Sequence, residues 1–363
     1  MPLPSHVTLV LALLVCLTNL PAFAQSATPA PAAQIAPPLQ PATGPGGAGV
    51  AYDGVLAQHF GPQPDGSAES IGYWLFEPTR PRDGTNTEPL PLVLFLHGFD
   101  LVDPEAYHVW IEHLVRRGAI VIYPDFQPEG LPFNPPTLTA LFASAPAAIE
   151  AAVRDALTQL AEPGHAQADL GKLAVVGHSL GATLGADFAG RAAPGLPQPA
   201  ALFLVMPGCP PTCDLQNLAQ VPATTRMLML IGDADDVAGM PPATRIWAAL
   251  SQIPADNKDV ILLQSDSHGA PPLPADHFVP LTTPMAPPAP PVGGLNSDDW
   301  YGTWKWQDAL MSCSFAGVDC EAALGDTPQQ RFMGLWSDGQ PVTEPRVTDD
   351  PATLAPSVAT PAT

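Results

Sequence analysis

The chain has 363 residues, of which 46% are hydrophobic, so it is long enough to bury the core of one large domain or two small ones. Only 13% of the residues are charged, and 35 acidic side chains outnumber 13 basic ones to give a formal net charge of −22. This charge argues against a nucleic-acid partner and against docking on an anionic membrane surface, because both carry negative charge.

The N-terminal segment has the composition of a secretory signal peptide, which we expect over residues 1–24. Residues 7–20 form an apolar run that is too short to cross a membrane comfortably, so we expect no stable membrane span. An A-x-A cleavage pattern follows at 22–24, and the protein is therefore expected to be secreted or periplasmic. Residues 25–50, rich in Pro, Ala and Gly, are expected to form a disordered linker, and residues 348–363 a disordered tail.

Strand and helix signals alternate between residues 51 and 347. Apolar runs predict strands at Ile71–Phe76, Leu92–Leu96, Ala119–Tyr123, Leu173–Val176, Ala201–Met206, Met227–Ile231 and Val260–Gln264. Helical spacing of apolar residues predicts helices at Pro104–Arg117, Thr137–Leu160, 182–188 and Pro242–Ile253. This alternation predicts an α/β fold, with a mostly parallel sheet and helices on both of its faces.

The most informative motif is the G-x-S-x-G pentapeptide at residues 177–181, which directly follows the apolar run Leu173–Val176. A serine that exposes its Oγ above a sheet needs a sharp turn between a strand and a helix, with small residues two positions to either side. The N-terminus of the following helix also favours developing negative charge. The motif therefore predicts Ser179 as a nucleophile.

A serine hydroxyl is a weak nucleophile at neutral pH, so it needs a base and a carboxylate that orients the base. Three carboxylates follow the predicted strand Met227–Ile231, at the sheet edge where Ser179 is expected. The G-x-x-D spacing favours Asp235, with Asp233 and Asp236 as alternatives.

Two histidines follow the predicted strand Val260–Gln264 and could lean over the sheet toward the serine. His268 is expected to be the base, because it lies closer to the end of the strand. His277 is the alternative.

The predicted strand Leu92–Leu96 ends in His-Gly-Phe, a sequence that suits an oxyanion hole. Gly98 permits a turn that brings the next amide inward. The backbone N–H of Phe99 can then act together with that of Leu180, the residue after the nucleophile.

Removal of the signal peptide would remove Cys16 and leave an even number of cysteines. An even number in an exported chain points to disulfides. The short spacings favour the pairs Cys209–Cys213 and Cys313–Cys320, although the sequence leaves the other connectivities open.

Residues 280–347 form a C-terminal extension that is dense in aromatic residues, with Trp300 and Trp304 one helical turn apart. Two interpretations are open. The extension is either an extra helix packed on the edge of the sheet, pinned by the Cys313–Cys320 bridge, or an aromatic wall over a substrate.

The chain resembles the α/β-hydrolase superfamily over residues from about 70 to about 280. The resemblance rests on the segments LPLVLFLHGF, AVVGHSLGA, LMLIGDADD and ILLQSDSHG. The chain is similar to secreted bacterial esterases and lipases, among them cutinase-like and dienelactone-hydrolase-like enzymes. This resemblance implies an α/β-hydrolase fold for residues 51–347. The resemblance implies that Ser179, Asp235 and His268 form a catalytic triad. It also implies that Phe99 and Leu180 are the oxyanion donors.

We therefore expect a secreted serine hydrolase that cleaves small or polymeric carboxylic esters through an acyl-enzyme intermediate. No metal and no organic cofactor is implied. The alternatives are an amide or peptide hydrolase or an acyltransferase on the same residues, or an inactive domain that only binds. The sequence leaves the oligomeric state open.

Overall fold

The computed structural model describes residues 34–61, 72–84, 88–210, 214–285 and 292–354. The chain divides into two units, Met1–Gln34 and Ile35–Thr363, and the fold described below is that of the second unit. The predicted signal peptide lies outside the described residues.

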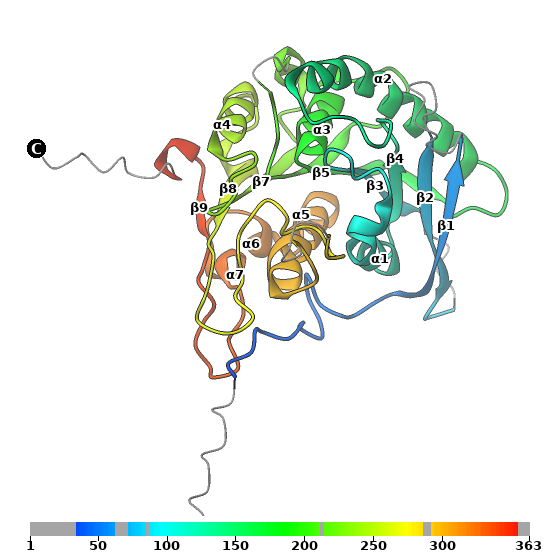
Figure 1. Ribbon diagram of the computed structural model, residues 1–363. Helices are drawn as coiled ribbons and strands as arrows, with labels where there is room; N and C mark the ends of the chain where they lie inside the picture. Colours follow the sequence, from blue (N-terminus) through cyan, green and yellow to red (C-terminus); the bar gives the residue numbers. More distant parts are fainter. Residues whose placement is uncertain (1–33, 62–71, 85–87, 211–213, 286–291, 355–363) are drawn as a thin grey trace, which may run out of the picture. The chain divides into compact units, whose positions relative to one another are not determined.

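The strands of the described chain form one nine-stranded sheet in the order β1-β2-β4-β3-β5-β6-β7-β8-β9 (Figure 1). Neighbouring strands from β4 through β3 to β8 are parallel. The edges are antiparallel, at β1, β2 and β9. The strands are β1 (Tyr52–Phe60), β2 (Tyr73–Pro81), β3 (Leu90–Leu96), β4 (Ile120–Pro124), β5 (Ala168–His178), β6 (Pro199–Val205), β7 (Arg226–Gly232), β8 (Lys258–Leu263) and β9 (Arg346–Thr348). The prediction of a mostly parallel sheet is confirmed.

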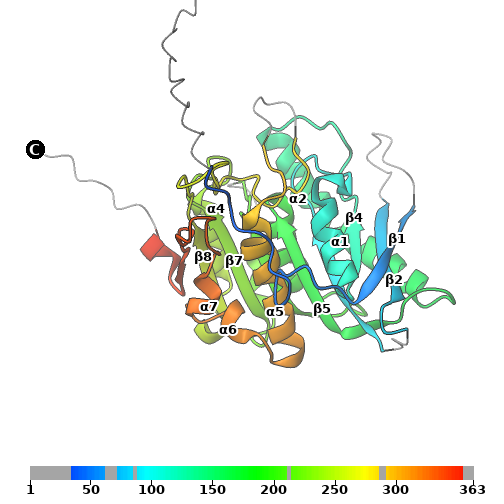
Figure 2. The same cartoon turned by 90° about the horizontal axis from the view of Figure 1, so that it is seen from below.

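Helices cover both faces of this sheet, as the alternation of strands and helices predicts. One face carries α2 (Pro135–Leu160), α3 (Leu180–Arg191) and α4 (Met240–Ala249). The other carries α1 (His108–Arg116), α5 (Trp304–Ala316), α6 (Cys320–Ala323) and α7 (Pro328–Arg331), as Figures 1 and 2 show from two directions.

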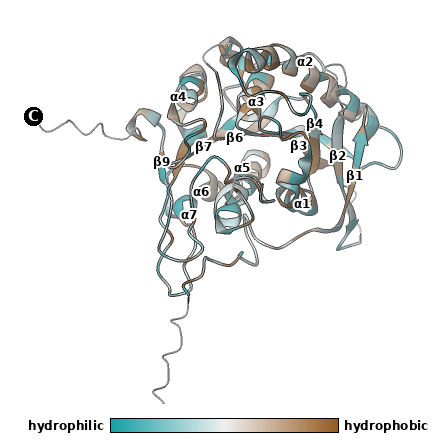
Figure 3. Ribbon diagram, viewed as in Figure 1, coloured by the Kyte–Doolittle hydropathy of each residue, from teal (hydrophilic) through white to brown (hydrophobic). Residues whose placement is uncertain are grey.

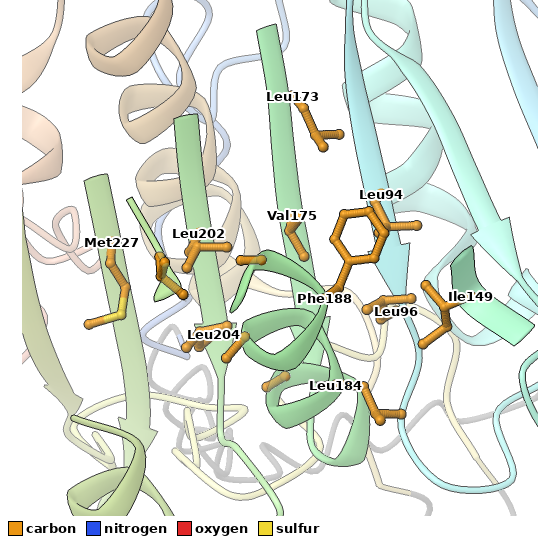
Figure 4. Packing of buried hydrophobic residues seen from close by; sticks show 14 of the residues in the cluster. Leu94, Leu96, Ile149, Leu173, Val175, Leu184, Phe188, Leu202, Leu204 and Met227 are labelled. Atoms are coloured by element: carbon orange, nitrogen blue, oxygen red, sulfur yellow. The ribbon is translucent and has the colours of Figure 1, made fainter. Parts of the chain in front are cut away.

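Each face of the sheet has its own hydrophobic core, so the buried parts of the central strands carry apolar residues on both faces (Figure 3). Leu94 and Leu96 of β3 belong to the core beneath α2 and α3. Val93 and Phe95 of the same strand belong to the core against α1 and α5. Figure 4 shows part of the first core, to which strands and helices both contribute: Leu94, Ile149, Val175, Leu184, Phe188 and Leu202.

The longest helix, α2, begins at an N-cap, where the side chain of Asn134 accepts a hydrogen bond of 3.0 Å from the amide of Thr137. By length and composition alone α2 could cross a membrane. Its inner face, however, places Ile149, Val153 and Ala156 in the core beneath it. The apolar character of α2 is therefore that of a helix that covers a sheet.

Residues 35–50, which we call the N-terminal strap, have defined positions against the domain, although their composition predicts a disordered linker (Figure 2). The carbonyl of Ile35 accepts a hydrogen bond of 2.9 Å from the amide of Ala270. The indole of Trp300 donates to the carbonyl of Pro38 at 3.2 Å. The linker prediction is therefore wrong for the strap, because backbone hydrogen bonds to distant segments fix it and composition does not reveal such bonds.

The middle of the strap is fixed at Gly46, whose φ of +75° and close approach to the Trp300 carbonyl exclude a side chain. The amide of Gly46 donates to Asp308 at 2.8 Å, and His113 and Arg117 also contact this carboxylate, at 2.9 and 3.2 Å. Burial raises the pKa of Asp308, but these partners outweigh burial and hold it below its usual range. The strap thus contributes a backbone N–H group to the ionic cluster around Asp308.

The C-terminal extension packs as an extra layer on the sheet. The predicted Cys313–Cys320 disulfide is present and joins the end of α5 to α6. Trp304 and Trp306 are buried in the core between α5 and the sheet, so the aromatic cluster belongs to an extra packed helix. The helix lies on the face over β6 and β7, however, and not on the predicted edge of the sheet. Part of the predicted tail is also ordered: Pro351–Leu354 form a 3₁₀ helix with Leu354 buried, so the boundary at 348 is wrong because this apolar side chain anchors the segment.

Candidate active site

Ser179 lies at the turn between β5 and α3 with φ 55° and ψ −120°, a conformation that is costly for any residue with a side chain. A Cβ at Gly177 would collide with the backbone of Gly181, and one at Gly181 would collide with the carbonyl of Leu96. The two glycines of the motif are therefore required by close backbone approach. The turn presents the serine Oγ at the carboxyl end of the parallel strands.

Three side chains form one hydrogen-bonded chain at this edge of the sheet. The Nε2 of His277 lies 2.9 Å from the Oγ of Ser179, and its Nδ1 lies 3.0 Å from Oδ2 of Asp235. The other oxygen of Asp235 accepts hydrogen bonds from the amides of Val237 and Ala238. Burial raises the pKa of Asp235, but these hydrogen bonds outweigh burial and lower it, so the carboxylate stays ionised and orients Nδ1–H toward itself.

The structure corrects the prediction for the histidine, because His268 does not reach the serine. Its ring is 39% exposed and pairs with Asp338 at 2.9 Å. An antiparallel bridge between Asp266 and Leu273 closes the segment that contains His268 into a separate turn. The loop then returns and delivers His277, so closeness to the strand end was the wrong criterion.

Of the three carboxylates after β7, only Asp235 faces the histidine. Asp233 instead accepts hydrogen bonds from the amide and the hydroxyl of Ser265, at 3.0 and 2.6 Å. That hydroxyl in turn accepts from the amide of Ala275 at 2.9 Å. Asp233 therefore anchors the loop that carries the histidine, and Asp236 is exposed.

Two cavities open on either side of Ser179. The first, here called the Leu180 cavity, has about 200 Å³, and the second, the His277 cavity, has about 230 Å³. Phe99 lines both, and Leu180 lines the first. The structure thus brings the two residues expected to donate to an oxyanion to the same cavity as the serine.

The lining of both cavities is mostly apolar, and no Lys or Arg occurs among the described residues that form it. Phe133, which is 67% exposed, and Val237, which is 49% exposed, stand at the boundary that the two cavities share. Further apolar side chains include Leu138, Pro210, Ala238 and Pro242 in the Leu180 cavity and Leu101, Phe278 and Met285 in the His277 cavity.

Gly208 is a site residue that the sequence analysis did not identify. Its amide donates to the carbonyl of Ser179 at 2.8 Å, and a Cβ there would lie 3.2 Å from the serine Oγ. The glycine therefore leaves space beside the Oγ of Ser179 in the Leu180 cavity. The available signal was its position shortly after β6, which ends at Val205 at the same edge of the sheet.

Within the described ranges, no group of three or more His, Cys, Asp or Glu side chains could hold a metal ion.

Comparisons with known proteins concern the central part of the chain. A family profile for the alpha/beta hydrolase fold matches residues 93–235, which include Ser179 and Asp235 but end before His277. None of the curated proteins matches the chain significantly. One solved structure, from Klebsiella pneumoniae subsp. pneumoniae MGH 78578 and described as a candidate dienelactone hydrolase, is 16% identical, with 58% of this chain and 85% of that chain covered and a TM-score of 0.42.

Proposed function

Because the chain has the α/β-hydrolase fold, we propose that it is a secreted serine hydrolase that cleaves carboxylic esters through an acyl-enzyme intermediate. One observation carries the proposal: Ser179, His277 and Asp235 form a continuous hydrogen-bonded chain beside two cavities. This arrangement has a nucleophile, a base and an orienting carboxylate in reach of one another, which acyl transfer requires.

In the proposed reaction, Nε2 of His277 takes the proton from Ser179 as Oγ attacks the ester carbonyl. The negative oxygen of the tetrahedral intermediate accepts hydrogen bonds from the amides of Phe99 and Leu180, and the N-terminus of α3 adds to this stabilisation. His277 then gives its proton to the leaving alcohol. Water, activated by the same nitrogen, attacks the acyl-enzyme and releases the acid, while Asp235 stabilises the imidazolium in both halves.

The cavities favour a neutral ester with an apolar group on each side of the bond. The described lining offers no cation to an anionic substrate, and the net charge of −22 repels such a substrate. A cavity of about 150 Å³ is enough for benzene, so each of these cavities suits a phenyl ring or a short alkyl chain. The leaving alcohol is assigned to the His277 cavity, where the proton donor lies.

We expect 4-nitrophenyl pentanoate to be hydrolysed with a kcat/KM about 100-fold or more above that of 4-nitrophenyl hydrogen succinate, which has a similar length. The physical reason is that an unpaired carboxylate loses its hydration without gaining a partner. Initial rates over a concentration series measure the ratio. Similar values for the two esters would contradict the assignment of neutral substrates.

Labelling by a fluorophosphonate, which reacts with activated serines, tests whether the protein is a serine hydrolase independently of its preference for neutral substrates. Labelling at Ser179 with hydrolysis of any ester supports a serine esterase. An unlabelled, folded protein that hydrolyses no ester would instead support a domain that only binds.

Export is part of the proposal, and the Cys313–Cys320 disulfide supports it because disulfides persist in oxidising compartments. The second predicted bridge, Cys209–Cys213, involves residue 213, which lies outside the described residues. We expect exported protein to begin near Gln25 and to contain no free thiol. Intact mass after alkylation without reductant measures both, and four alkylated cysteines would contradict the disulfide prediction.

A further inference from the structure

His178, the residue before the nucleophile in the motif, lies between two parts of the candidate site. Its Nδ1 is 2.7 Å from the hydroxyl oxygen of Tyr107, and its Nε2 is 2.9 Å from the carbonyl oxygen of His277. The Tyr107 oxygen is also 3.0 Å from the amide nitrogen of Gly98. His178 and Tyr107 are both buried.

The direction of every hydrogen bond in this chain is determined. A carbonyl oxygen can only accept, so Nε2 of His178 carries a proton and donates to His277. Burial, with the nearby His277 ring, lowers the pKa of His178 well below its usual value, so the ring is neutral and Nδ1 accepts from the hydroxyl of Tyr107. The oxygen of Tyr107 then accepts from the amide of Gly98.

The two ends of this hydrogen-bonded chain lie in two loops, and the proposed reaction depends on their position relative to each other. Gly98 precedes Phe99, whose amide is a proposed oxyanion donor, and His277 is the proposed base. A side chain at Gly98 would press on this chain, because a Cβ would lie 3.0 Å from Nδ1 of His178 and 3.3 Å from the Tyr107 oxygen. The hydrogen-bonded chain therefore ties both loops to β5, which ends at His178 directly before Ser179.

We propose that Tyr107 and His178 are positioning residues that hold the oxyanion loop and the base in register with Ser179. This inference rests on the proposed function. Displacing a reacting group by about 1 Å can lower the rate by about 100-fold, so loss of this chain should reduce kcat while substrate binding in the cavities persists.

The first test is Tyr107→Phe, which leaves the ring and removes the hydroxyl. We expect kcat to fall by about 10- to 100-fold with KM within about twofold, since the oxyanion loop loses its tie while the cavities remain. The loss should be similar for 4-nitrophenyl butyrate and ethyl butyrate, because the oxyanion forms with both. The matched control is Tyr73→Phe, which removes the hydroxyl of another tyrosine, bonded to Asp155 at 2.7 Å in a partly buried position between β2 and α2. The control should keep the wild-type kcat.

The second test compares His178→Leu with His178→Gln. Leucine leaves the His277 carbonyl without its donor. We therefore expect kcat to fall more for ethyl butyrate than for 4-nitrophenyl butyrate, because the poor leaving group of ethyl butyrate needs a proton from the base. Glutamine keeps an N–H donor and should recover about tenfold in kcat over leucine. This pair also carries the test if Tyr107→Phe does not fold.

The outcomes distinguish a failure of the positioning role from a failure of the proposed function. Folded Tyr107→Phe with the wild-type kcat, or equal kcat for the two His178 variants, would overturn the positioning role. Wild-type protein that is neither labelled at Ser179 nor active on esters would overturn the proposed function itself.

Discussion

Replacing Ser179 with alanine should lower kcat for ester hydrolysis by about 10⁴- to 10⁶-fold, because the acyl-enzyme cannot form without the hydroxyl oxygen. The fold should remain intact. The substitution keeps the Cβ at the turn and removes only an oxygen that faces two cavities and bonds to His277. Single-turnover and steady-state rates on 4-nitrophenyl butyrate measure the loss, and the thermal midpoint reports the fold.

The matched control is Ser144→Ala, which removes a hydroxyl on the exposed side of α2. It should behave as wild type. A folded Ser179→Ala variant that keeps more than about a tenth of the wild-type kcat would exclude Ser179 as the nucleophile.

Replacing His277 with alanine should reduce kcat about as much as Ser179→Ala, because nucleophile and base act as one unit. For the same reason, the double variant should be no slower than either single variant. His268→Ala should keep kcat within about twofold, since that ring pairs with Asp338 at the surface, where such pairs contribute little. The two histidine variants are therefore each other's control, and a larger loss for His268→Ala would reassign the base.

The sequence predicts those parts of the site that depend on local rules. Ser179 is predictable from the strand before it, the turn and the two glycines, at whose positions no side chain fits. Asp235 is predictable from its spacing after a strand. Most strands and helices were predictable for the same reason, since a buried parallel strand is apolar throughout. Strand β1 was not predicted, because only part of this edge strand is buried.

The histidine could not be predicted by the same reasoning, because distant residues determine the path of its loop. Asp266 accepts hydrogen bonds from the indole of Trp336, at 3.2 Å, and from the amide of Thr343, at 2.8 Å. These partners lie in the C-terminal extension, and no local pattern in the loop reveals them. The ordered strap escaped prediction for the same reason.

The strap has a practical consequence for anyone who expresses this protein. Composition suggests trimming the chain to a start near residue 51, yet Ile35 bonds to Ala270 in the loop that leads to His277. Its neighbour Ala36 exchanges hydrogen bonds with Ser337, at 2.9 and 3.0 Å, and so joins the two ends of the domain. A recombinant form should therefore start upstream of the strap, and an affinity tag belongs at an end that leaves residues 35–50 free to dock.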